Sequence, residues 1–341
     1  MGNQEIQEKV KVTFFSTQVY DKQFFTACNQ GFGFELEYYD THLGPHIAGI
    51  VQQSQAVCVF VNDKLDARVV KTLARNGVKI IALRCAGFNN VDLAACKELG
   101  IKVCRVPAYS PEAVAEHAVA MIMTLNRKTH KAYNRVREQN FSLNGLLGFD
   151  LHGKTIGVLG TGNIGQAFCK IMLGFGCKVM AFDLIADKRL EAIGVTYHPL
   201  TDIFSQADVI SLHCPLNEQT KHIINADSIQ MMKKGVMLIN TSRGGLLDTA
   251  AAIQGLKSAQ IGYLGIDVYE QEEKLFFKDL SGDIIQDDQI QRLMSFPNVL
   301  VTAHQAFFTA EALQQIAFTT LSNIAALANG QPVVNKAAIL V

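Results

Sequence analysis

Short apolar runs alternate with longer stretches of helical spacing along most of this chain. The runs are rich in β-branched residues and occupy positions 10–15, 56–61, 79–83, 101–104, 155–159, 178–182, 208–212, 236–240, 263–268 and 298–302. Apolar runs of this length predict buried strands. Strands that alternate with helices form parallel sheets covered on both faces. The pattern therefore predicts an α/β fold.

The alternation falls into two blocks. The first covers residues 10–105 and ends at a segment with two prolines, 106–111, which is typical of a crossing between domains. A strong helical pattern follows at 112–125, and the second block runs from 154 to 301. A last helical pattern at 311–329 is expected to return to the first block. We predict one domain made of residues 1–107 plus 306–341 and a second made of residues 108–305.

Composition excludes several classes of function. The 341 residues contain 31 Lys+Arg and 31 Asp+Glu, so the formal net charge is zero, which argues against a nucleic-acid partner. The apolar runs are far shorter than the roughly 18 residues that span a bilayer, so no membrane partner is expected. The N-terminus lacks the pattern of a signal peptide. Eight cysteines without a CxxC pair favour a reducing, cytoplasmic location. Spacing suggests no metal site.

A glycine signature is the motif with the most specific context. Gly160, Gly162 and Gly165 follow the strand at 155–159 and precede a helical pattern at 166–175, and the next strand ends in Asp183. Such glycines permit a tight turn, close approach of a pyrophosphate to a helix N-terminus, and close packing of helix on strand. A carboxylate at position 183 binds a ribose 2′-hydroxyl and repels a 2′-phosphate. We therefore predict NAD as the cofactor.

This motif assigns a role to each domain. Residues 108–305 are expected to form an NAD-binding Rossmann domain, and residues 1–107 plus 306–341 a substrate-binding domain. The expected architecture is two Rossmann-like/flavodoxin-like parallel-sheet domains with a cleft between them.

Polar residues that follow predicted strands are candidates for hydride-transfer chemistry. Arg243 follows the strand at 236–240 and suits a carboxylate, because its guanidinium forms bidentate contacts. His304 follows the strand at 298–302 and is a natural proton donor. A carboxylate beside the imidazole would favour the charged ring. Spacing alone leaves four acidic residues open for this role, namely Asp267, Glu270, Glu272 and Glu273.

These motifs together resemble the D-isomer-specific 2-hydroxyacid dehydrogenases, over about residues 10–330. The resemblance rests on the signature 160–165 with Asp183 and on residues 213–216, 240–244, 265–270 and 302–307. Residues 84–92 and 106–111 look closer to the lactate branch of the family than to its glycerate or phosphoglycerate relatives.

The resemblance implies a role for each site residue. Arg243 matches the arginine that binds substrate and polarises its carbonyl, His304 the proton donor, and Glu272 the carboxylate paired with that histidine. Family contacts to NAD match Gly160, Gly162, Asn163, Ile164, Gly165, Asp183, Cys214, Pro215, Thr220, Thr241, Ser242, Arg243 and Asp267. Contacts to substrate match the backbone amides of Ala86 and Gly87, the aromatic ring of Tyr109, and the side chains of Arg243 and His304.

The implied activity is the fermentative, reversible reduction of pyruvate to D-lactate by NADH. Two alternatives stay open: reduction of another 2-keto acid such as hydroxypyruvate or phenylpyruvate, and an NAD-sensing, corepressor-like binding protein. Hinge closure near 106–111 and 303–307 is expected, because hydride transfer needs water excluded. The family implies a homodimer or homotetramer, with the helix at 112–125 as a candidate interface. The stretch 271–291 is expected to join subunits or to be a surface excursion.

Overall fold

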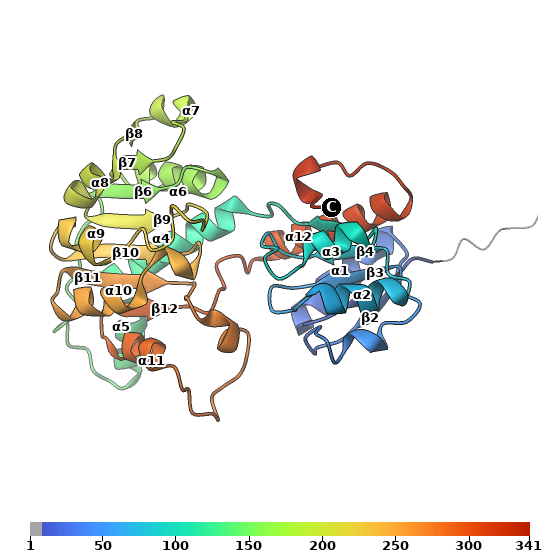
Figure 1. Cartoon of the computed structure of the whole chain (residues 1–341). Helices are drawn as coiled ribbons and strands as arrows, with labels where there is room; N and C mark the ends of the chain where they lie inside the picture. Colours follow the sequence, from blue (N-terminus) through green and yellow to red (C-terminus); the bar gives the residue numbers. More distant parts are fainter. Residues whose placement is uncertain (1–8) are drawn as a thin grey trace, which may run out of the picture. The chain divides into compact units, whose positions relative to one another are not determined.

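The computed structural model describes residues 9–341, and these residues form two compact units (Figure 1). Unit 1 comprises the chain up to Ser110 and again from Phe308, and unit 2 runs from Pro111 to Phe307. The boundaries differ by a few residues from those expected. The expectation about a signal peptide falls largely on residues 1–8, which lie outside the described residues. Within residues 9–341, no helix has the length and apolarity needed to cross a membrane.

Unit 1 is built on a five-stranded parallel sheet. Its strand order is β2-β1-β3-β4-β5, with β1 (Lys11–Phe14), β2 (Glu35–Tyr38), β3 (Ala56–Val59), β4 (Ile80–Leu83) and β5 (Lys102–Arg105). This is the flavodoxin-like order, in which the direction of winding reverses between β1 and β3. The carboxyl ends of these strands carry Ser16, Phe60, Arg84 and Val106, so their loops meet at one edge of the sheet.

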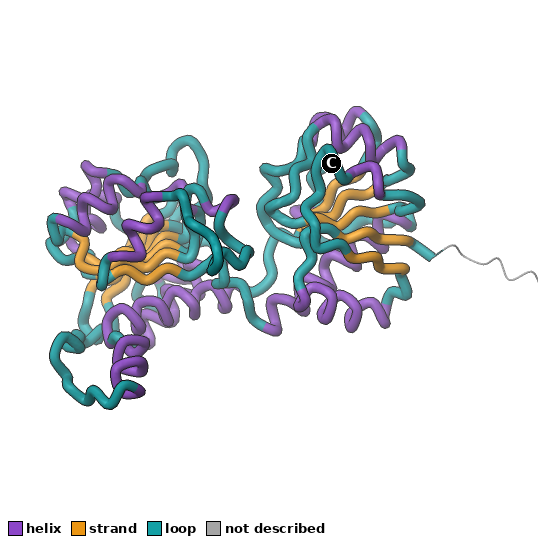
Figure 2. The backbone as a smooth tube through the Cα atoms, turned by 90° about the horizontal axis from the view of Figure 1, so that it is seen from below, coloured by secondary structure: helices purple, strands orange, loops and turns teal. Residues whose placement is uncertain are grey.

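Helices cover both faces of the unit 1 sheet (Figure 2). The helices α2 (Ala67–Arg75) and α3 (Leu93–Glu98) pack on the face that carries Val57, Ile81 and Val103. The helix α12 (Ala310–Ala328) packs beside α1 (Val19–Cys28) and against β4 and β5. The C-terminal helix therefore belongs to the first unit, because its apolar side chains complete that core.

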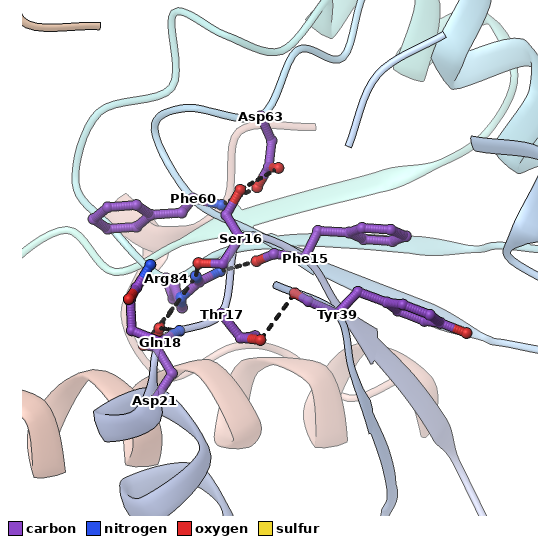
Figure 3. Close-up of polar contacts among 9 residues, drawn as sticks. All are labelled: Phe15, Ser16, Thr17, Gln18, Asp21, Tyr39, Phe60, Asp63 and Arg84. Carbon is purple, nitrogen blue, oxygen red and sulfur yellow. Dashed lines mark hydrogen bonds and ion pairs between the residues drawn. The ribbon is translucent and has the colours of Figure 1, made fainter. Parts of the chain in front are cut away.

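A buried polar cluster ties together the loops at the carboxyl edge of this sheet (Figure 3). Arg84 is 2% exposed and donates to the Asp21 carboxylate and to the carbonyls of Phe15 and Ser16. Ser16 has a left-handed backbone (φ 55°), and its hydroxyl lies 2.6 Å from the buried Asp63 carboxylate. A buried guanidinium needs such partners, because an unpaired buried charge is strongly destabilising. The cluster fixes the loops after β1 and β4.

Unit 2 contains a seven-stranded parallel sheet of order β12-β11-β10-β9-β6-β7-β8, stacked in this order in Figure 1. The order around β6 is that of the doubly wound dinucleotide-binding fold, in which the direction of winding reverses between β6 and β9. The strands are β6 (Thr155–Leu159), β7 (Lys178–Phe182), β8 (Thr196–Tyr197), β9 (Val209–Leu212), β10 (Val236–Asn240), β11 (Ile261–Ile266) and β12 (Val299–Val301).

Two helical layers enclose this sheet. One layer holds α4 (Pro111–Arg127) and α6 (Asn163–Gly174), and the other holds α8 (Leu200–Gln206), α9 (Ala226–Met231), α10 (Thr249–Lys257) and α11 (Asp288–Ser295). The helix α5 (Thr129–Arg137) follows α4, and the short helix α7 (Lys188–Glu191) adds Leu190 to the same core as α4 and α6. Both faces of β9 and β10 are buried, which explains their nearly continuous apolar sequence.

Candidate active site

Two glycines, one in the turn after β6 and one in the first turn of α6, have no room for a side chain. Gly160 has φ +95°, and a Cβ there would lie 2.6 Å from the Cys214 nitrogen. A Cβ on Gly165 would lie 2.0 Å from the Gly160 carbonyl oxygen. Gly162 differs, because a Cβ there would meet nothing within 4 Å. Gly162 is the N-cap of α6, no side chain caps this helix, and Asn163 and Ile164 form its first turn. These open N–H groups fit the pyrophosphate of a dinucleotide.

The loops after β9 and β10 complete this edge of the sheet. Thr241 is 7% exposed, and its Oγ1 is a buried polar atom without a hydrogen-bond partner among the described residues. Ser242 donates to the Cys214 carbonyl at 2.8 Å. Burial raises the pKa of the Cys214 thiol to about 11, which makes this thiol a poor nucleophile. A buried hydroxyl without a partner and an uncapped helix at the same edge of the sheet are consistent with a bound polar cofactor.

Other predicted cofactor contacts lie on exposed or half-buried loops of unit 2. The Thr220 hydroxyl donates to the Pro215 carbonyl at 2.6 Å, so these two residues share one turn. Asp183 follows β7 and accepts hydrogen bonds from the backbone and hydroxyl of Thr161.

His304 and Glu272 form a direct pair. The distance from His304 Nδ1 to Glu272 Oε1 is 2.9 Å, and the two side chains are 22% and 24% exposed. The Tyr269 backbone N–H donates to the other Glu272 oxygen at 2.9 Å, which fixes the carboxylate. Since Nδ1 faces a carboxylate, it carries a proton, and Nε2 is the atom left for exchange with a ligand.

The structure distinguishes among the four acidic residues that spacing left open. Glu270 contacts His222 and Thr249 instead, with Glu270 Oε1 2.7 Å from His222 Nε2. Asp267 is fully buried and accepts hydrogen bonds from backbone N–H groups next to His304. Glu273 is exposed. Of these four acidic side chains, all among the described residues, Glu272 is the one that contacts the His304 ring.

Asp267 holds the turn that carries His304. Its carboxylate accepts hydrogen bonds from the Thr302 hydroxyl and from the backbone N–H groups of Gln305 and Ala306. Its backbone carbonyl accepts from the His304 N–H at 2.7 Å, and His304 adopts a left-handed φ of 52°. This conformation is uncommon for residues other than glycine and persists when surrounding contacts fix it.

Sequence reasoning missed the neighbour of Asp267 on α4. His117 Nε2 lies 3.1 Å from the Thr302 hydroxyl and 3.5 Å from Asp267. Burial raises the pKa of the Asp267 carboxyl, but the hydrogen bonds from His117 and the other donors outweigh burial, and the pKa lies below its usual value. Nothing in the sequence signalled this contact, because 150 residues of chain separate the two side chains.

Arg243 lies after β10 and its side chain is exposed. Its guanidinium donates to the Ser242 carbonyl at 2.7 Å, and no carboxylate among the described residues forms a salt bridge with it. Asn240 shapes this turn by donating to the Arg243 carbonyl and accepting from the Ser242 N–H. Arg243, Asp267 and His304 thus follow the neighbouring strands β10, β11 and β12.

The predicted substrate contacts Ala86, Gly87 and Tyr109 lie in unit 1, after β4 and β5. No described residue accepts a hydrogen bond from the backbone N–H of Ala86 or Gly87, so both amides are open. Arg105 donates to the Ala86 carbonyl at 2.7 Å, and this contact was not predicted. Because a trans peptide directs its C=O and N–H oppositely, Arg105 turns the Gly87 N–H away from itself.

Comparison with known proteins identifies the family. Residues 119–306 match the model of the D-isomer specific 2-hydroxyacid dehydrogenase, NAD binding domain. The chain is 53% identical over 327 residues to a D-lactate dehydrogenase of Escherichia coli (strain K12), covering 96% of this chain and 99% of that protein. The chain belongs to the D-isomer-specific 2-hydroxyacid dehydrogenase family.

Solved structures of this dehydrogenase family share the whole fold. A structure described as the pyruvate reductase of Chlamydomonas reinhardtii is 47% identical, covers 96% of this chain and 98% of its own, and has a TM-score of 0.92. An Aquifex aeolicus D-lactate dehydrogenase solved with NAD and lactic acid is 34% identical, covers 96% and 98%, and has a TM-score of 0.83. The protein is therefore an NAD-dependent oxidoreductase that acts on a small-molecule substrate, and its cofactor is NAD.

Proposed function

We propose that this protein reduces pyruvate reversibly to D-lactate with NADH. The observation that carries the proposal is the His304–Glu272 pair, placed at the same sheet edge as the open guanidinium of Arg243. Relatives named D-lactate dehydrogenase match nearly the full chain and support this substrate. An intact proton donor with its paired carboxylate speaks against the corepressor-like binding protein.

In the proposed mechanism, unit 2 supplies the chemistry. Arg243 binds the substrate carboxylate and polarises the keto oxygen, because its guanidinium offers several N–H donors in one plane. NADH supplies the hydride that reaches C2. His304 gives the proton on Nε2 to the developing alkoxide, and Glu272 accepts a hydrogen bond from Nδ1, which fixes the orientation of the ring for that step. Oxidation of D-lactate runs the same steps in reverse.

The cofactor contacts are proposed for the uncapped turn of α6 and the loops beside it. Residues 160–165 would hold the pyrophosphate and Asp183 the ribose. The half-buried Cys214, the buried Thr241 hydroxyl, Ser242 and the turn with Pro215 and Thr220 would line the nicotinamide half, with Asp267 near the amide. In our proposal, Asp267 acts chiefly by fixing the backbone beside His304.

Unit 1 is proposed as the substrate-binding domain. The open amides of Ala86 and Gly87 suit a carboxylate, and Tyr109 would limit the size of the substrate. Residues 106–111 and 303–307 stay the proposed hinge, and the chain passes between the units at 110–111 and 307–308.

We also propose a homodimer or homotetramer in a reducing, cytoplasmic compartment. The helix expected as an interface offers little for this, because the exposed residues of α4 are Glu112, Glu116, Ala120 and Arg127. Large exposed apolar side chains lie instead on α5 and the following loop, at Tyr133, Val136, Phe141, Leu143 and Leu147.

All eight cysteines are free thiols. Phe276 of the 271–291 stretch is buried in its own unit, whereas Ile284 is 85% exposed.

The test compares keto acids and one histidine variant. We expect NADH absorbance to fall faster with pyruvate than with hydroxypyruvate or phenylpyruvate. The variant His304→Gln should lower kcat by roughly 10²- to 10⁴-fold while NADH fluorescence still reports binding. His198→Gln, at the far edge of the same sheet, is the matched control and should keep the wild-type rate.

Each other outcome contradicts part of the proposal. Faster turnover of a bulkier keto acid would reassign the substrate. Wild-type turnover by His304→Gln would remove its role as proton donor. Binding of NADH without turnover of any keto acid would favour the sensor.

A further inference from the structure

A chain of hydrogen bonds links three separate segments at the edge of the unit 2 sheet. The backbone N–H of Asp187 and the Tyr197 hydroxyl lie 3.0 Å apart, and that hydroxyl lies 3.0 Å from Thr161 Oγ1. Thr161 Oγ1 lies 3.0 Å from Asp183 Oδ2. The chain therefore ends on the carboxylate that follows β7.

The direction of this chain is fixed by its two ends. A backbone N–H can only donate, so Asp187 donates to Tyr197, and a carboxylate can only accept, so Thr161 donates to Asp183. The Thr161 hydroxyl donates its single proton to Asp183, so it can only accept a hydrogen bond from the Tyr197 hydroxyl. Hydrogen bonds aligned in one direction polarise one another, which strengthens the last of them.

The chain leaves Asp183 with one oxygen for a ligand. Oδ2 already accepts from the Thr161 N–H at 2.6 Å and from the Thr161 hydroxyl, which uses both of its lone pairs. Oδ1 accepts from the Leu184 N–H at 2.7 Å and keeps a second lone pair open. The orientation of the carboxylate is thus set before any ligand arrives.

We propose that Tyr197 and Thr161 are positioning residues for cofactor selection, which hold Asp183 so that Oδ1 accepts from the ribose 2′-hydroxyl of NAD. The inference rests on the proposed ribose contact of Asp183. A fixed carboxylate cannot rotate away from a 2′-phosphate, so the two negative charges repel each other and NADPH binds weakly. The loop from Asp183 to Asp187 contains no cation, and Arg189, which lies just beyond it, is already paired with Asp187 at 2.7 Å.

The test measures binding and not turnover, so it stands whether or not the keto-acid chemistry is correct. The variants are Tyr197→Phe and Thr161→Val, and Tyr133→Phe, an exposed tyrosine on α5, is the matched control. Dissociation constants are measured by NADH fluorescence for NADH, for NADPH, and for NADH without the adenosine 2′-hydroxyl. Thermal melting confirms that each variant is folded.

Tyr197→Phe removes one hydrogen bond of the chain and should raise the Kd of NADH about 2- to 10-fold. Thr161→Val should do the same or more, because it breaks the bond to Asp183 itself. The Kd of NADPH should stay the same or fall, so the preference for NADH over NADPH should decrease. Neither variant should change the Kd of the 2′-deoxy cofactor, whose missing hydroxyl removes the contact.

Asp183→Ala separates failure of the inference from failure of the ribose contact. If Asp183→Ala still prefers NADH over the 2′-deoxy cofactor as the wild type does, the proposed ribose contact is wrong and the inference falls with it. If Asp183→Ala loses that preference but Tyr197→Phe keeps it, the ribose contact stands and the inference is overturned. If Tyr197→Phe raised the Kd of NADH and the Kd of the 2′-deoxy cofactor by the same factor, the role of Tyr197 would be merely structural, and the inference would also be overturned.

Discussion

Substitution of Gly162 by alanine separates cofactor binding from folding. Gly162 has an ordinary φ of −62°, and a Cβ there would meet no atom of the protein within 4 Å. We predict that Gly162→Ala folds with a free energy of unfolding within about 1 kcal/mol of the wild type, since alanine at an N-cap costs no more than this relative to glycine. In the proposed cofactor site, the added methyl would instead occupy the space through which the pyrophosphate approaches the first turn of α6.

The expected loss of affinity follows from the contacts displaced. Charge-assisted hydrogen bonds from backbone N–H groups contribute about 1.5–3 kcal/mol, so losing one raises the Kd of NADH about 10- to 100-fold. Gly165→Ala should behave differently, because its Cβ would lie 2.0 Å from the Gly160 carbonyl oxygen. A backbone shift is then required, and this variant should lose about 1–3 kcal/mol of stability as well.

The assay combines fluorescence titration with NADH and urea unfolding without cofactor. Gly174→Ala is the control, since it lies at the other end of α6 and its Cβ would also meet nothing within 4 Å. It should bind NADH like the wild type. The reasoning is refuted if Gly162→Ala binds NADH with wild-type affinity, or if it loses affinity only because it unfolds.

Three further predictions concern other parts of the molecule. Glu272→Gln keeps the size of the side chain but removes its charge, so kcat should fall about 10- to 100-fold with an unchanged Kd for NADH. Asp21→Asn removes the salt-bridge partner of the buried Arg84 and should cost about 3–5 kcal/mol in urea unfolding. Burial lowers the pKa of His213 to about 3. As the pH falls below about 6.5, His213 therefore takes up a proton in the unfolded chain but not in the folded protein. The free energy of unfolding should fall by about 2 kcal/mol at pH 5 for this reason, and His213→Gln should not show this loss.

Strands with an apolar sequence could be predicted, including the edge strands β5 and β12, whereas the edge strands β2 and β8 could not. The sequence patterns predict β6, β7 and β10 at the observed bounds, because strands covered on both faces are apolar throughout. The patterns miss β2, whose residues alternate Glu35-Leu-Glu-Tyr, and β8, which has only two residues. A strand at the edge of a sheet is hydrogen-bonded to one neighbouring strand and is less buried than a central strand, so it can form without an apolar sequence.

Positions in the candidate site were predictable, but their contacts were not. Residues that follow parallel strands gather at one sheet edge, which is why Arg243 and His304 could be named from spacing. Spacing could not choose among four acidic residues for the partner of His304, and the resemblance to the family named Glu272. The contacts of Tyr197 with Thr161 and of His117 with Thr302 join distant segments and leave no periodic trace in the sequence.

The stereochemistry of the product tests the central proposal most directly. Pyruvate and NADH are incubated with the enzyme until the absorbance of NADH is lost, and the lactate formed is resolved on a chiral column. The proposed function predicts D-lactate as the product, equimolar with the NADH consumed. Formation of L-lactate, or consumption of NADH without lactate, would contradict it.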